Sequence, residues 1–120
     1  MANQLVWVDI PVLDIDRAIV FYSAVLGAPL AKQEYPGFVI GLLPGAGTDV
    51  SGCLYVSETD KPSEVGPLIY LNCSGRLADA VAAVSANGGT VIKDAHEIGP
   101  HGFRAIVKDT EGNRIALHSM

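Results

Sequence analysis

The chain has 120 residues, of which 49% are hydrophobic and 18% are charged. This length suits one domain, and the apolar fraction is high enough for a buried core, which argues against a disordered chain. The formal net charge of −5 argues against nucleic acid or an anionic membrane as a partner. Because no apolar stretch approaches membrane-spanning length and no basic leader opens the chain, we expect a cytoplasmic protein.

The first predicted strand covers residues 5–12. Every second residue from Val6 to Val12 is aliphatic, which is the period of a strand with one buried face. Trp7 and Asp9 lie between these positions, so we expect them on the face turned away from the helices. The only tryptophan of the chain is therefore predicted to form the floor of a ligand site, because an indole suits a planar ligand.

A helix is predicted to follow from Asp16 to Leu26. Asp14 or Asp16 is expected to cap its N-terminus, because a short carboxylate accepts hydrogen bonds from the unpaired amides of the first turn. Gly27 ends the helix, and Pro29 prevents its continuation. Residues 38–43 and 52–56 are then apolar runs typical of strands, separated by a glycine-containing loop.

Residues 57–66 are polar and include Pro62, which is typical of a linker. A second unit follows, with a strand at 68–73, a helix at 77–87, the pair Gly88-Gly89, and further strands. The last two strands, 103–107 and 114–118, flank a loop at 109–113 with good hairpin chemistry. Module one is therefore predicted at about 3–57, the linker at about 58–66 and module two at about 67–120.

Both modules have the order βαβββ, which predicts an α+β fold. A unit of this size cannot bury its own apolar face, so the two modules should share a core. Joined edge to edge, they should form a curved, cup-shaped mixed sheet with the helices on the outside. The concave face of such a cup is where a small molecule is expected to bind.

Three segments resemble the vicinal oxygen chelate superfamily, which includes glyoxalase I, bleomycin resistance proteins and extradiol dioxygenases. They are residues 14–27, 86–89 and 109–113, the last followed by a strand. Together they span nearly the whole chain in the order typical of that family. The resemblance implies a single domain over residues 1–120, and it is closest to the small bacterial glyoxalase-like proteins that have no assigned reaction.

The resemblance also indicates where metal ligands would stand. Members with metal chemistry carry His, Gln or Glu on the inner strands, and the equivalent positions here are Trp7, Ala116, one residue of 54–56, and either Leu68 or Ile69. Apart from a tyrosine, none of these side chains can donate a lone pair to a divalent cation. We therefore expect no metal site and no cofactor, which departs from the metal-dependent enzymes of the family.

The predicted ligand-binding residues share one face of the cup by strand alternation. They are Trp7, Asp9, Arg114 and His118, joined by Tyr70 and Asn72 if Leu68 rather than Ile69 is the inner position. His101 lies in a loop between Gly99 and Gly102, and it is the candidate for proton transfer because histidine titrates near neutral pH. His96 is interpreted as a surface residue.

These observations favour a small-molecule-binding, glyoxalase-like protein without the family's metal site and with an unknown substrate. One alternative is a metal-independent enzyme of the lyase or isomerase type that uses His101 or an acid of the cup. A second alternative is an accessory interaction domain whose cup is filled by its own side chains. A homodimer is expected, because the apolar content is high and each module has a sheet edge to cover.

Overall fold

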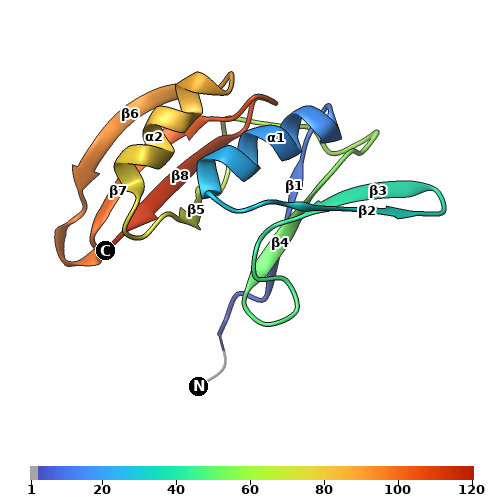
Figure 1. Ribbon diagram of the computed structural model, residues 1–120, viewed down its shortest axis with the longest axis horizontal. Coiled ribbons are helices and arrows are strands. Elements are labelled where there is room, and N and C mark those ends of the chain that lie inside the picture. The colour runs from blue at the N-terminus through green and yellow to red at the C-terminus, as the bar shows by residue number, and fades with distance from the viewer. Residues whose placement is uncertain (1–2) are drawn as a thin grey trace.

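The computed structural model describes residues 3–120 and consists of two βαβββ modules (Figure 1). The elements of module one are β1 (Trp7–Pro11), α1 (Ile15–Leu26), β2 (Ala31–Tyr35), β3 (Phe38–Leu42) and β4 (Ser51–Tyr55). Those of module two are β5 (Ile69–Asn72), α2 (Leu77–Ala86), β6 (Thr90–Glu97), β7 (Phe103–Lys108) and β8 (Arg114–Ser119). A short 3-10 helix, η1 (Gly99–His101), precedes β7. The order predicted from the sequence is confirmed.

Each module forms a four-stranded mixed sheet of the same topology. The strand orders are β1-β4-β3-β2 and β5-β8-β7-β6. In both sheets the first strand of the module runs parallel to the last, and the other neighbours are antiparallel. The α+β fold of two repeated modules is therefore confirmed, with the strands divided between two sheets. The β2–β3 hairpin projects away from module two (Figure 1).

The core lies between the two helices and one face of each sheet. The helices pack against each other and lie side by side in Figure 1. Along β1, Ile10 is buried whereas Trp7 is 44% exposed, so the side chains alternate as predicted. The buried residues of the helices are Ala18, Phe21, Tyr22 and Val25 in α1, and Ala80 and Val84 in α2.

Helix α1 begins and ends at residues that the sequence indicated as its caps. Asp14 is the N-cap, and its carboxylate accepts a hydrogen bond from the amide of Arg17 at 3.1 Å, which decides between Asp14 and Asp16. Gly27 ends the helix with φ = 69°, a left-handed conformation that suits glycine. Neither helix of residues 3–120 is long and apolar enough to span a membrane.

The turn between β7 and β8 joins module two to module one. The carboxylate of Glu111 accepts hydrogen bonds from the amides of Leu13 and Asp14, at 2.9 and 2.8 Å. It also accepts two from the guanidinium of Arg17, both at 2.8 Å. The buried carboxylate therefore holds the start of α1 against this turn.

Two further contacts cross the same boundary. The buried hydroxyl of Tyr22 donates to Asp109 Oδ2, and Asn113 Nδ2 donates to the carbonyl of Pro11 at 2.8 Å. Asn113 Nδ2 also lies 3.0 Å from Asp109 Oδ2, which links the two contacts. The polar groups buried between the modules are therefore paired with one another, as burial requires.

Candidate functional site

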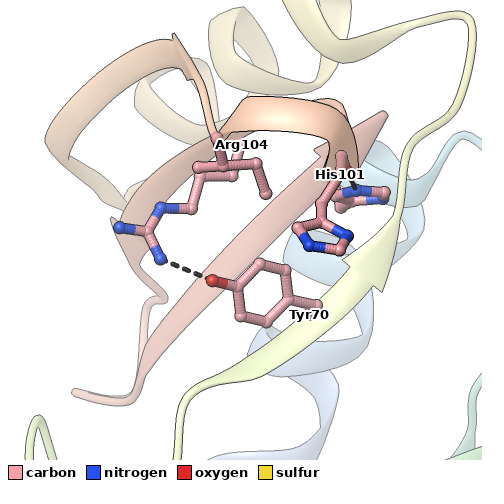
Figure 2. A pocket seen from close by; sticks show the side chains of 5 residues that line it. Tyr70, His101 and Arg104 are labelled. Carbon is pink, nitrogen blue, oxygen red and sulfur yellow. Dashed lines mark hydrogen bonds between the residues drawn. The ribbon is translucent and has the colours of Figure 1, made fainter. Parts of the chain in front are cut away.

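An open cavity of about 460 Å³ lies on the module-two sheet, on the face opposite the helices. Figure 2 shows three of its side chains converging, from β5, from η1 and from β7. The residues that line the cavity are Tyr70, Ile98, His101, Arg104 and His118.

Strand register explains why these side chains meet. β8 lies between β5 and β7, and His118 is opposite both Asn72 and Arg104. Tyr70 is opposite Ala116, two residues earlier on β8. Because side chains two residues apart share a face of a strand, Tyr70, Arg104 and His118 project on the same side.

The register of β5 also decides which residue of this strand faces inward. Leu71 and Cys73 are buried, and Ile69 packs against the core, whereas Tyr70 is 45% exposed. Alternation therefore gives Leu68 the face of Tyr70, and the alternative assignment of Ile69 is wrong.

Arg104 is held in place by two neighbours. Its Nε donates to Nε2 of His96 at 3.1 Å, and its Nη1 donates to the hydroxyl of Tyr70 (Figure 2). Nδ1 of His96 lies 2.8 Å from the carbonyl oxygen of Asp94, which can only accept. The proton of the neutral His96 ring is therefore on Nδ1, and Nε2 is free to accept from Arg104.

The two histidines of the cavity are connected. Nε2 of His118 lies 2.6 Å from the carbonyl oxygen of His101, so Nε2 donates and Nδ1 of the neutral ring carries the lone pair. Gly102 allows this approach with φ = 95°, and a Cβ at that position would lie 2.4 Å from the carbonyl oxygen of Ser119. The imidazole of His101 itself faces the cavity (Figure 2).

Trp7 and Asp9 form a separate cluster on the module-one sheet. The indole Nε1 of Trp7 donates to Asp9 Oδ1 at 2.8 Å, and the Cys53 thiol lies 3.4 Å from the same oxygen. Burial, followed by the effect of the Asp9 carboxylate, raises the pKa of Cys53 to about 11, so the thiol stays protonated. Neither Trp7 nor Asp9 lines the cavity of module two.

Two other predicted site residues bind backbone instead of lining this cavity. Arg114 lines a smaller pocket of about 160 Å³ beside the linker, where its Nη2 donates to the carbonyl of Gly66 at 2.9 Å. Asn72 Oδ1 accepts from the amide of Ser74 at 2.9 Å. Of the residues predicted from the sequence, the cavity therefore brings together Tyr70, His101 and His118.

The comparisons with known proteins agree with this architecture. The sequence matches the model of the Glyoxalase/Bleomycin resistance protein/Dioxygenase superfamily over residues 4–117. The chain belongs to this superfamily. It is 31% identical over 121 residues to a glyoxylase-like domain-containing protein of Didymella fabae, across 96% of this chain and 92% of that protein.

Two solved structures share the fold of this chain. A glyoxalase/bleomycin resistance protein from Albidiferax ferrireducens T118 superposes with a TM-score of 0.76 at 18% identity, covering 98% of this chain and 99% of that one. A fosfomycin resistance protein from Listeria monocytogenes superposes with a TM-score of 0.70 at 13% identity, covering 100% and 95%. At these identities the superpositions establish the fold.

The donor set of this glyoxalase-like chain does not fit the family's metal centre. Ala116 has no donor atom and is fully buried, and Leu68 is apolar. Of residues 54–56, the one on the face of Trp7 is Tyr55, which is opposite Pro11 in the register, and its hydroxyl donates to Asp60 at 3.0 Å. Within residues 3–120 no group of three or more His, Cys, Asp or Glu side chains is placed to hold a metal ion.

Sequence reasoning missed Ile98 and Arg104. Arg104 could have been found from the sequence. It lies on a predicted strand in which Ala105 and Val107 are buried, so strand alternation places Arg104 on the opposite, outward face. A charged residue at an outward position of a mostly apolar strand marks a solvent-accessible face. Ile98 lies between β6 and η1 and had no comparable signal.

Proposed function

We propose that this glyoxalase-like protein binds a small organic molecule in the cavity of module two, without the metal centre of the family's enzymes. The observation that carries the proposal is the open cavity of about 460 Å³. This volume is in the range of about 300–1,000 Å³ that is typical of small-molecule sites. The few polar groups that line it converge from separate strands, as in sites that orient a ligand.

The lining provides both contact area and orientation. The ring of Tyr70, with its centroid 6.1 Å from that of His118, presents a flat surface for an unsaturated or aromatic group. Ile98 adds apolar surface, and Arg104 and His101 supply polar atoms at the periphery. A molecule bound here would lie on the sheet beneath the η1 segment.

A fragment screen by thermal shift and native mass spectrometry tests this function. Binders should stabilise the protein, and Tyr70→Ala should abolish the stabilisation. Val20→Ala is the control, because Val20 is an exposed residue of α1 in module one. If no fragment of any charge binds, or if the binders respond only to Val20→Ala, the proposed function is wrong.

A second candidate function is metal-independent proton transfer. It is favoured by the hydrogen bond between His118 Nε2 and the His101 carbonyl, because a fixed tautomer places the basic Nδ1 in one orientation. Turnover of a bound fragment should then persist in EDTA and be lost in His118→Ala or His101→Ala. Turnover that EDTA abolishes would contradict this candidate.

The cellular location proposed is the cytoplasm. It is supported by Cys53 and Cys73, both of which are buried free thiols, as expected in a reducing compartment. Fractionation of the source cells tests the location, and recovery of the protein outside the cytoplasm would contradict it.

A further inference from the structure

We propose that the ligand of this cavity is an organic carboxylate with one negative charge, and that Arg104 is its anchor. This inference rests on the proposed function and names the class of ligand. It is carried by the way in which Arg104 uses its hydrogen-bond donors.

The guanidinium of Arg104 has N–H donors that bind no acceptor within residues 3–120. Arginine carries five N–H groups, and the structure engages two of those in Arg104, one with His96 and one with Tyr70. Nη2 has no acceptor among residues 3–120, and neither has the second N–H of Nη1. One N–H of Nη1 and both N–H groups of Nη2 are left over, and one from each nitrogen can bind the two oxygens of a carboxylate.

The other arginines of the chain are used differently. Arg17 pairs with the carboxylate of Glu111. Arg76 donates to the carbonyl of Val25, and Arg114 donates to a carbonyl of the linker. Within the described part of the chain, Arg104 is the arginine that contacts neither a carboxylate nor a carbonyl, and its two partners are uncharged.

Arg104 is also fixed before any ligand arrives. His96 receives the Nε–H, and its own ring is held by the carbonyl of Asp94. Tyr70 receives the Nη1–H from the other side. A guanidinium held at two points loses less conformational entropy on binding than a free side chain, which favours affinity.

Two features of the cavity favour an organic monoanion over an inorganic anion. Arg104 is its one permanently charged lining residue, which matches a single negative charge. Tyr70 accepts from Arg104, so its own O–H remains available to a second carboxylate oxygen or to a neighbouring polar group. The adjacent Tyr70 ring and Ile98 can contact the carbon skeleton attached to the carboxylate.

The test compares acids with their neutral counterparts on the intact protein. Benzoate, phenylacetate, cinnamate and hexanoate are each titrated beside the corresponding primary amide, and binding is followed by calorimetry and by the side-chain Nε–H resonance of Arg104. The variants are Arg104→Gln, Arg104→Lys and Tyr70→Phe. Lys93→Gln is the control, because Lys93 is an exposed residue of β6 and loses the same charge.

At least one acid should bind, with its amide about tenfold weaker or worse, because a charge-assisted, two-point hydrogen bond is lost. Arg104→Gln should weaken that acid roughly 10- to 100-fold, Arg104→Lys should restore only part of the loss, and Lys93→Gln should change binding less than about twofold. If Arg104→Gln fails to fold, Arg104→Lys and Tyr70→Phe give the same comparison.

The inference is overturned if the amides bind as well as the acids, or if Lys93→Gln weakens an acid as much as Arg104→Gln. Inorganic phosphate that competes as strongly as the best acid would also overturn it, because the cavity would then recognise charge alone. In these cases neutral fragments that depend on Tyr70 would leave the proposed function standing. Failure of acids, amides and the wider fragment set together would refute the proposed function as well.

Discussion

Arg17 and Glu111 form a two-point ion pair across the boundary between the modules, with Arg17 Nε and Nη2 each 2.8 Å from a carboxylate oxygen. Arg17 belongs to the segment 14–27 and Glu111 to the segment 109–113, the two outer parts of the family resemblance. The two segments are therefore in direct contact, because the turn between β7 and β8 binds the start of α1. The pair stabilises the placement of the two modules.

Replacing Glu111 with glutamine tests the contribution of this pair. The side-chain carbonyl of Glu111→Gln can still accept from a backbone amide, but the charge that faces Arg17 is lost. We expect the free energy of unfolding to fall by about 1–3 kcal/mol, measured by urea denaturation at neutral pH. Glu64→Gln is the control, because Glu64 is exposed and 3.9 Å from Lys108, and it should cost less than about 0.5 kcal/mol. Equal effects of the two substitutions would contradict the prediction.

The same carboxylate should make stability depend on acid. Burial alone would raise the pKa of Glu111, but hydrogen bonds from Arg17, Thr110 and two backbone amides outweigh it and lower the pKa to about 2 from the ordinary 4.5. The unfolded chain therefore takes up the proton first. The stabilisation is complete above about pH 4.5 and is lost as the pH falls toward 2, by roughly 3 kcal/mol in all.

Urea denaturation at a series of pH values measures this dependence. Other carboxylates titrate in the same range, so the informative quantity is the difference between the wild type and Glu111→Gln. That difference should shrink as the pH falls below about 4.5. A difference that stays constant down to pH 2.5 would show that the charge of Glu111 does not contribute.

The hydrogen bond from Tyr22 to Asp109 should be measurable on its own. Burial, together with the charge of Asp109, raises the pKa of Tyr22 well above its ordinary value, so the hydroxyl remains a donor. Tyr22→Phe should lower the free energy of unfolding by about 1–2 kcal/mol, because a buried carboxylate loses one donor. Tyr35→Phe removes an exposed hydroxyl that donates to Gln33, and thermal denaturation should show almost no change for it.

Trp7 should contribute little to stability. Its side chain is 44% exposed, whereas Phe21 is fully buried. Trp7→Ala should therefore cost less than about 1 kcal/mol, and Phe21→Ala roughly 3–5 kcal/mol, the cost of a core cavity. A large loss from Trp7→Ala in chemical denaturation would favour the filled-cup alternative. The role of Trp7 in ligand binding stays a prediction, and a saturable change in its fluorescence on addition of a bound fragment would support it.

We also propose that the protein is a homodimer. The open face of the module-one sheet exposes Tyr35 and Phe38, whose stacked rings lie 4.9 Å apart, and such a surface is typically covered by a partner. Sedimentation velocity should give twice the chain mass of 12.6 kDa, and Phe38→Asp should shift the protein to monomer. Val65→Asp, at an exposed position of the linker, should leave the dimer intact. A wild-type monomer at all concentrations would refute the proposal.

The parts of this protein that the sequence predicts are those set by local periodicity. Alternation along β1 placed Trp7 and Ile10 on opposite faces, Gly27 marked the end of α1, and its start was narrowed to a cap by Asp14 or Asp16. The pairing register between strands depends on residues far apart in the sequence, so local periodicity does not predict which side chains meet across strands. His96 was interpreted as a surface residue, but it holds Arg104 from the neighbouring strand.

Irregular pairing made that contact harder to predict. The ladder between β6 and β7 shifts register twice, between Val91 and Lys93 and again between Lys93 and His96. Simple alternation fails across such shifts, because an extra residue turns the following side chains to the other face. Alternation along β7 alone places Arg104 on the open face of the sheet, but its contact with His96 could not be predicted from the sequence.

Strand β8 connects the Arg17–Glu111 ion pair to the cavity. The turn that precedes it supplies Glu111, and near its other end His118 lines the cavity, so the six residues of this strand connect the interface between the modules to the cavity. A slip of β8 by one residue would turn His118 inward and displace Glu111 from Arg17 at the same time. A chain in which β8 is misregistered should therefore lose the interface and the cavity together. Recovery of fragment binding at the cavity on refolding should then report that β8 has paired in its native register.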